Sequence, residues 1–241
     1  MKKQTRDTVI QYLGTARFAP YLNAAGGNQK TALHLYSWGA DLASAIQTTL
    51  WMTEVVLRNA MDRQLQVWNE RETGNVSWLL EPPASPLRSL TAGKRTQAID
   101  RAERALAKRS PAHPRFEEPL THDDILSNAT FAMWKDLLPN HLPEANPSNQ
   151  DNQNRLPMWD ECLHLAFPAV EDPEGERTFW RVFHIHGLRN RVSHMDSLLN
   201  VDVADIIGDA FDLVGSIDPA LRNWISGTSR VSYVLSRRPE I

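Results

Sequence analysis

The chain lacks several features that mark whole classes of protein. It has a single cysteine, Cys162, in 241 residues, so no disulfide can form within one chain and a reducing compartment is expected. It contains no run of about 18 uninterrupted apolar residues, the length that a membrane-spanning helix requires. Residues 1–7 are polar and do not resemble the apolar core of a secretion signal. We therefore expect a cytoplasmic protein with no membrane partner.

The chain also has little excess charge, because 26 Lys and Arg face 29 Asp and Glu, for a formal net charge of −3. This balance excludes a broad positive field that would attract nucleic acid. Any RNA contact must come from a local basic patch, and the densest lies within 81–120, which we predict to be a basic helical insertion. The alternative is a solvated helix with internal pairs such as Asp100 with Arg104. The candidate RNA-binding residues of this segment are Lys94, Arg95, Arg101, Arg104 and Lys108.

Apolar residues recur at spacings of three and four over most of the sequence, which predicts an all-α protein. The longest such stretch, 30–72, has no proline and is compatible with one helix or with two joined near Ser37. The Asn-, Gln- and Pro-rich range 140–157 predicts an exposed loop. In the range 228–235, β-branched residues alternate and favour a short extended C-terminal arm. Further helices are expected at 121–138, 158–167, 176–199 and 203–214.

A polar motif, Leu-Arg-Asn-Arg-Val-Ser-His, occupies 188–194. On a helix with about 100° per residue, Asn190 and His194 share one face, and Arg189 and Arg191 flank it. A guanidinium stabilises a negatively charged phosphate and an imidazole transfers protons near neutral pH, so the motif suits phosphate chemistry. The alternative is a solvated face with a chance histidine. The opposite face is expected in the core and carries Ile185, Leu188, Val192, Met195 and Leu199.

A second segment, Glu54-Val55-Val56-Leu57-Arg58-Asn59, lies upstream. Glu54 precedes Arg58 by four residues, which predicts an intrahelical ion pair. Apolar neighbours such as Trp51 suggest that the pair is partly buried and meets the 188–194 motif, whereas the alternative is a surface pair of little energy. This segment echoes the later motif but has Arg63 at the position of the histidine. Each chain thus carries one complete motif.

Together these segments resemble the Abi-like (abortive infection, AbiD/AbiF-type) proteins of the HEPN superfamily, which also supplies the nuclease domains of type VI CRISPR effectors. The resemblance extends from about Tyr12 to Leu199. One departure is Ala132-Met133 before Trp134, where the family has Gly-Phe; this affects packing rather than chemistry. The segments that carry the resemblance are Leu35-Tyr36-Ser37-Trp38 with Leu42, Glu54-Val55-Val56-Leu57-Arg58-Asn59-Ala60-Met61, Phe131-Ala132-Met133-Trp134 with Leu137-Leu138, and Leu188-Arg189-Asn190-Arg191-Val192-Ser193-His194.

The resemblance implies a single HEPN-type helical bundle over 1–241, a homodimer and metal-independent endoribonuclease activity without a cofactor. It makes Arg189 and His194 catalytic, places Asn190 beside the arginine, and supplies Glu54 as an acidic residue from an earlier helix. Arg58 and Arg191 become candidates for RNA contact. One histidine cannot easily act as both acid and base, so a composite site with two histidines across a two-fold axis is expected.

Three alternatives remain beside this interpretation. The chain is compatible with a non-catalytic module that binds a noncoding RNA or a partner, and with a toxin held inactive by an antitoxin or inhibitor. A zinc site built from His184, His186, His194 and Cys162 is disfavoured, because His184 and His186 diverge by about 200° on a helix.

Overall fold

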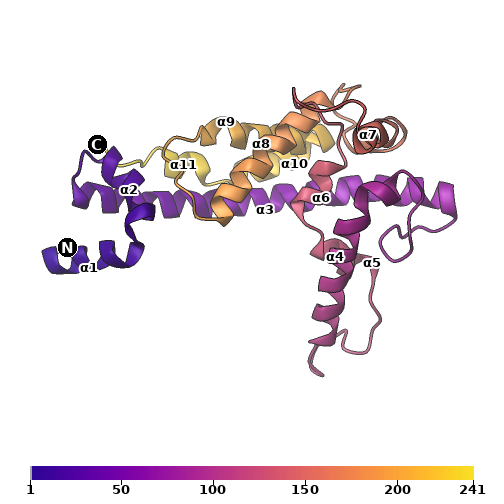
Figure 1. Ribbon diagram of the computed structural model, residues 1–241, viewed down its shortest axis with the longest axis horizontal. Coiled ribbons are helices and arrows are strands. Elements are labelled where there is room, and N and C mark those ends of the chain that lie inside the picture. Colours follow the sequence, from indigo (N-terminus) through magenta and orange to yellow (C-terminus); the bar gives the residue numbers. More distant parts are fainter. Residues whose placement is uncertain (1) are drawn as a thin grey trace. The chain divides into compact units, whose positions relative to one another are not determined.

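A computed structural model describes residues 2–241, and all regular secondary structure in that range is helical (Figure 1). The prediction of an all-α protein is therefore confirmed. The chain forms two compact units. The first unit comprises the chain up to Thr53 together with His184–Gly215 and Ala220–Ile241, and the second comprises Glu54–Phe183 with Ser216–Pro219. The division into one HEPN-type domain with an insertion at 81–120 stays a prediction.

Helix α3 (Gln29–Thr73) contributes its N-terminal part to the first unit and its C-terminal part to the second, as α8 (Glu176–Ser193) does in the opposite order. The other helices of the first unit are α1 (Lys3–Leu13), α2 (Thr15–Ala24), α9 (Val203–Ile217), α10 (Pro219–Thr228) and α11 (Val231–Leu235). The second unit holds α4 (Leu87–Ala107), α5 (His122–Asn128), α6 (Phe131–Asp136), α7 (Gln150–Glu161) and the 3₁₀ helix η1 (Leu163–Ala166).

Helix α3 is one uninterrupted helix, which resolves the choice left open by its sequence. Asn28 caps its start, since the Asn28 side-chain oxygen accepts from the backbone N–H groups of Lys30 and Thr31 at 3.0 and 3.2 Å. Gly74 follows its end with φ of 78°, a left-handed conformation that glycine adopts without strain. The absence of proline between these two signals lets the apolar pattern continue as a single element.

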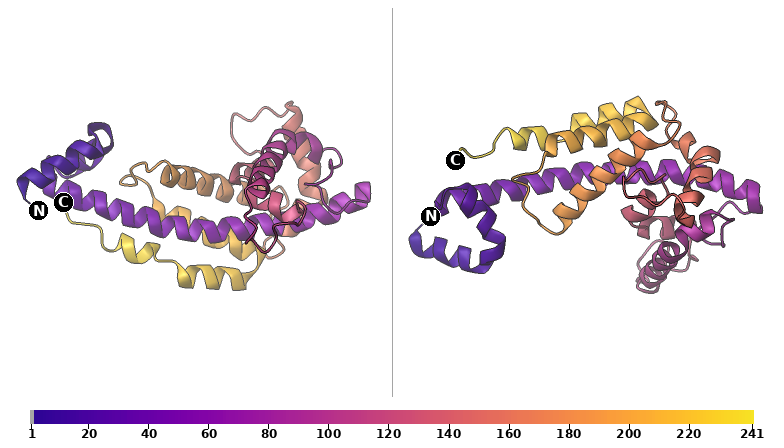
Figure 2. Two further views of the ribbon diagram at one scale, coloured as in Figure 1. Left: turned by 90° about the horizontal axis from the view of Figure 1, so that it is seen from below. Right: turned by 45° about the horizontal axis from the view of Figure 1, so that its top comes forward.

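The core of the first unit lies between the N-terminal part of α3 and the C-terminal helices. Figure 2 shows α11 running alongside that part of α3. The indole N–H of Trp38 on α3 donates to the carbonyl of Val234 on α11 at 2.8 Å. Gly39 permits α2 to approach, because a side-chain carbon there would lie 3.1 Å from the hydroxyl of Tyr21. Fully buried residues of this core include Leu35, Leu42, Ile46, Leu213, Val214 and Ile225.

In the second unit, α4 and α5 lie side by side (Figure 1). The carboxylate of Asp124 on α5 binds two arginines of the segment that connects the two helices. Asp124 accepts from Arg109 at 2.8 Å and from Arg115 at 2.9 Å, and it completes the capping box predicted with Thr121. Burial alone would raise the pKa of Asp124, but the hydrogen bonds from Arg115 and Thr121 outweigh it and hold that pKa well below its usual range.

A buried carboxylate also fixes the segment that follows α3. Asp62 is 2% exposed and accepts from the indole N–H of Trp78 at 2.8 Å and from His122 Nε2 at 2.9 Å. Ser77 Oγ lies 2.8 Å from the other ring nitrogen of His122. A buried carboxylate is stable when it is hydrogen-bonded in this way, so the network holds α3, the turn at Ser77 and the start of α5 together.

The helix predicted over 121–138 is divided into α5 and α6 at Ala129 and Thr130. Two segments that were predicted to be non-helical contain helix. Helix α7 begins at Gln150, inside the range 140–157 predicted as a loop, because Asn149 caps it by accepting from the N–H groups of Asp151 and Asn152. Its polar composition therefore reflects an exposed helix surface. The C-terminal range 228–235 holds the last residue of α10 and the whole of α11 rather than an extended arm, because Val231 and Val234, three residues apart, are both buried on one helix face.

Candidate functional site

The 188–194 motif lies at the C-terminal end of α8, in the first unit from His184 onward. The helix ends in a Schellman motif, with the N–H of Asp196 donating to the carbonyl of Arg191 at 2.8 Å and the N–H of Met195 to that of Val192 at 3.1 Å. Met195 adopts φ of 55°, a left-handed conformation that costs a non-glycine residue about 1–2 kcal/mol. His194 is therefore the last residue before a sharp reversal of the chain.

This early helix end corrects one prediction. Ile185, Leu188 and Val192 are buried as expected, but Met195 is 72% exposed. The sequence pattern extended α8 to residue 199, whereas the left-handed turn at 195 redirects the chain. Leu199 is also buried, but it belongs to the segment that follows the turn and not to α8.

Arg17 on α2 secures this turn and was not found from the sequence. Its guanidinium donates to the carbonyl of Met195 and lies 3.4 Å from the carbonyl of His194. A cation at the C-terminal end of a helix is favourable because the last carbonyls carry partial negative charge. Arg17 therefore holds the backbone on which the imidazole of His194 is mounted. No sequence signal pointed to it, because the contact joins residues 177 and 178 positions apart.

The side chains of the motif differ in their surroundings. Arg189 and Asn190 are half-buried, and Asn190 Nδ2 lies 3.4 Å from His186 Nε2. Arg191 and His194 are exposed. Within residues 2–241, the side chains of Arg189, Arg191 and His194 make no hydrogen bond or ion pair, so they remain accessible to a ligand.

Helix geometry fixes how Arg189 and His194 are presented. Five residues correspond to about 140° of rotation and about 7.5 Å of rise. The two groups therefore flank a ligand rather than point at it from one line. Asn190 follows Arg189 and shares a face with His194, which places an amide between the cation and the proton carrier. This arrangement fits a phosphodiester whose oxygens contact Arg189 while a neighbouring hydroxyl faces His194.

The upstream residues Glu54 and Arg58 lie on the part of α3 that belongs to the second unit. Both side chains are half-buried, in agreement with the expected partial burial. The predicted ion pair between them is wrong, since Arg58 enters no ion pair among residues 2–241 and its buried Nε atom has no hydrogen-bond partner there. The grouping of Glu54 with Arg189 stays a prediction.

The candidate RNA-binding residues of helix α4 fall into two groups, those engaged within the second unit and those that are exposed. Lys94 forms an ion pair with Asp136, and Arg95 donates to the carbonyls of Trp78 and Leu80, both at 3.1 Å. Burial lowers the pKa of Arg95, as expected for a guanidinium engaged inside the fold. These two residues therefore stabilise the second unit.

The remaining basic residues of α4 are exposed. Arg101 donates to the carbonyl of Asn128 at 3.3 Å, and Arg104 donates to the carbonyl of Asp100 at 3.0 Å, so neither charge is neutralised by a carboxylate. Lys108 is exposed at the helix end. The candidate RNA-binding surface of α4 thus consists of Arg101, Arg104 and Lys108.

The residues considered for zinc are dispersed. Cys162 is buried in the second unit, and burial raises the pKa of its thiol to about 12. His184 Nδ1 lies 2.8 Å from Asp209 Oδ2 in the first unit. Among residues 2–241, no three His, Cys, Asp or Glu side chains gather as metal ligands.

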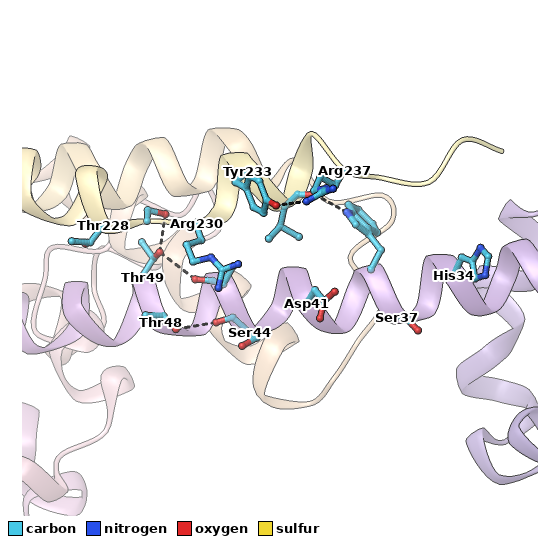
Figure 3. Close-up of a pocket in the computed structure, with 14 residues that line it drawn as sticks. His34, Ser37, Asp41, Ser44, Thr48, Thr49, Thr228, Arg230, Tyr233 and Arg237 are labelled. Carbon is cyan, nitrogen blue, oxygen red and sulfur yellow. Dashed lines mark hydrogen bonds between the residues drawn. The ribbon is translucent and has the colours of Figure 1, made fainter.

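The structure also shows a polar groove in the first unit that sequence reasoning missed (Figure 3). It has a volume of about 660 Å³ and lies between α3 and the C-terminal segment 228–237. The three arginines of the C-terminal tail were a sequence sign of an anion-binding surface. The α3 residues that form the other side of the groove are brought next to them only by the fold. The tail arginines are Arg230, Arg237 and Arg238.

Comparison of the chain with protein-family models, with curated proteins and with solved structures finds no match. In the part of the chain that the structure describes, no helix combines the length and the apolar character needed to cross a membrane.

Proposed function

We propose that the protein is an endoribonuclease of the HEPN type that cleaves RNA without a metal ion. The observation that carries this proposal is the end of α8, where Arg189, Asn190 and His194 lie within two turns on a helix end fixed by a Schellman motif. The side chains of Arg189 and His194 have no partner within residues 2–241 that substrate would need to displace.

The proposed reaction is an internal transfer within the RNA strand. His194 accepts the proton of a ribose 2′-hydroxyl, and the resulting oxygen attacks the adjacent phosphorus. The bond from phosphorus to the 5′-oxygen breaks, and that oxygen receives a proton. Arg189 stabilises the extra negative charge on the phosphoryl oxygens of the transition state. The products are a 2′,3′-cyclic phosphate and a 5′-hydroxyl, and DNA resists because it lacks the 2′-hydroxyl.

The reaction needs a proton acceptor and a proton donor at once, and each chain supplies one motif histidine. We propose a homodimer in which the two His194 imidazoles share these roles, with Arg189 from each chain in the same cleft. Glu54 is proposed to orient Arg189. The resemblance also supports a role in anti-phage abortive infection, with an antitoxin, inhibitor or noncoding RNA restraining the activity.

The decisive experiment incubates the purified protein with labelled single-stranded RNA in EDTA. We expect cleavage with cyclic-phosphate ends, and a loss of about 100-fold or more in His194→Ala. His113→Ala is the matched control, because His113 is an exposed histidine of the second unit that lies outside the motif. Activity that EDTA abolishes and Mg²⁺ restores contradicts the proposal, as does full activity of His194→Ala.

A second candidate function is binding of RNA without cleavage. The exposed Arg101, Arg104 and Lys108 favour it, because they offer phosphate contacts that require no chemistry. The same assay separates the two functions. A pure binding module retains labelled RNA in a shift assay, leaves it intact, and is unaffected by His194→Ala.

A further inference from the structure

The groove of the first unit is lined by the apolar residues Trp38, Ala45 and Val234 and by polar residues on both sides (Figure 3). Two hydrogen bonds join the walls across it: Trp38 donates to the carbonyl of Val234 at 2.8 Å, and the hydroxyls of Thr49 and Ser229 lie 3.0 Å apart. Trp38, Thr49 and Val234 are buried. Because these residues are packed and its walls are tied together, the groove is preformed, as small-molecule sites usually are.

One wall carries positive charge beside an aromatic ring. The guanidinium carbons of Arg230 and Arg237 lie 5.9 and 5.1 Å from the centre of the Tyr233 ring. Arg237 also contacts the Tyr233 hydroxyl, whereas Arg230 makes no hydrogen bond or ion pair within residues 2–241. In Figure 3, Arg230 extends from the C-terminal segment toward Ser44 on α3. Two cations without a carboxylate partner form a site for an anion, and guanidinium groups suit phosphate oxygens best.

The opposite wall is lined by hydroxyls and one carboxylate. Ser37, Asp41, Ser44 and Thr48 follow one another along α3 at spacings of four, three and four, and all are exposed. Asp41 has no ion-pair partner among residues 2–241. A carboxylate that faces a small-molecule site accepts hydrogen bonds from hydroxyls, and ribose presents two of them. Asp41 lies midway along the α3 wall, between Ser37 and Ser44, and would repel an anion there. A ligand whose anionic group contacts the arginines must therefore present hydrogen-bond donors to Asp41.

We propose that this groove binds a ribonucleotide. Its phosphate contacts Arg230 and Arg237, its base stacks on Tyr233 and the guanidinium planes, and its ribose hydroxyls donate to Asp41. Tyr233 is 53% exposed and so leaves ring surface for stacking. The volume of about 660 Å³ lies within the range typical of small-ligand sites. A simple anion leaves Asp41 and Tyr233 unused, and a neutral sugar leaves both arginines unused.

The same chemistry has two sources: a free mononucleotide, or one nucleotide of a single-stranded RNA. Isothermal titration calorimetry with AMP, GMP, CMP and UMP tests the first source in the wild-type protein. Fluorescence anisotropy with a labelled RNA oligonucleotide tests the second, in a His194→Ala background that keeps the RNA intact. Since both arms measure binding, they do not depend on whether the protein cleaves RNA.

Three variants address the three contacts. Arg230→Gln and Tyr233→Ala are each expected to weaken binding about tenfold. Asp41→Asn is expected to weaken binding of a ribonucleotide. Binding of the 2′,3′-dideoxy analogue should be unchanged, since that analogue offers no ribose hydroxyl to the carboxylate. Arg177→Gln is the matched control, because Arg177 is an exposed arginine of the second unit outside the groove.

Saturable binding of a mononucleotide with this variant pattern supports a free nucleotide as the ligand. The same pattern in the oligonucleotide alone supports an RNA strand. The proposal is overturned if neither ligand binds, or if binding is insensitive to Arg230→Gln and Tyr233→Ala. Failure of RNA cleavage by the wild-type protein contradicts the proposed function and leaves this inference standing.

Discussion

The guanidinium of Arg17 donates to the carbonyl of Met195, the residue directly after His194, and so joins α2 to the end of α8. Met195 holds a left-handed conformation, and its carbonyl is one of those that a helix end leaves exposed. The backbone around His194 is thus fixed from both sides, by the Schellman motif within the chain and by Arg17 from another helix. Rigid mounting of this kind is what a proton-transfer residue requires.

Met195→Gly should stabilise the protein by about 1 kcal/mol, because glycine adopts the left-handed conformation without the steric cost that a side chain adds. Chemical denaturation measures the change. Met195→Val is the opposing control and should lower stability, since a β-branched side chain raises the steric energy of the left-handed conformation. Cleavage by Met195→Gly should stay at the wild-type rate, and a destabilised glycine variant would show that the turn is not strained.

Asp124→Asn should destabilise the second unit by about 2 kcal/mol at neutral pH, because it weakens the charged hydrogen bonds from Arg109 and Arg115. The pKa of Asp124 is lowered in the folded state, so its contribution is present above the unfolded pKa and declines as pH falls toward the folded value. The stability difference between wild type and Asp124→Asn should therefore shrink below about pH 4. Denaturation curves between pH 3 and 7 give the result, and a constant difference would contradict it.

Reversal of Arg101, Arg104 and Lys108 to Glu should weaken RNA binding and reduce the salt dependence of the binding constant by about 2 in log–log slope. The helix should remain folded because these side chains are exposed. Arg95→Ala is an informative contrast, since it removes hydrogen bonds to the carbonyls of Trp78 and Leu80 and should lower stability instead. Unchanged affinity and slope in the triple variant would exclude this surface from RNA binding.

Mixing two inactive variants tests the composite site. His194→Ala and Arg189→Ala should each abolish cleavage without unfolding the protein, since His194 is exposed and Arg189 is half-buried with no partner within residues 2–241. If subunits exchange, each mixed dimer holds one His194 and one Arg189. Because the proposed reaction needs two His194 imidazoles, the mixture should stay inactive, and recovered activity would show that one imidazole suffices. Analytical ultracentrifugation measures whether each sample is dimeric. A fully active monomer would refute the composite site.

The sequence predicted those parts of the fold that depend on local signals. The length of α3 follows from an unbroken apolar pattern between Asn28 and Gly74, and the capping box of Thr121 and Asp124 was visible as a spacing. The end of α8 could not be predicted, because Met195 is a helix-favouring residue placed in a left-handed turn by tertiary contacts such as Arg17. Arg58 illustrates the same limit, since its spacing from Glu54 predicted an ion pair that is not formed among residues 2–241.

Gly39 has a consequence that reaches beyond its own helix. The residue leaves room for the ring of Tyr21, and Tyr21 lies one turn from Arg17 on α2. The helix that packs against α3 through Tyr21 therefore also carries Arg17, whose guanidinium donates to the carbonyl of Met195. A methyl group added at position 39 would lie 3.1 Å from the Tyr21 hydroxyl, so the Tyr21 ring would have to shift by a few tenths of an ångström. The close packing of Tyr21 against α3 thus depends on the absence of a side chain at position 39.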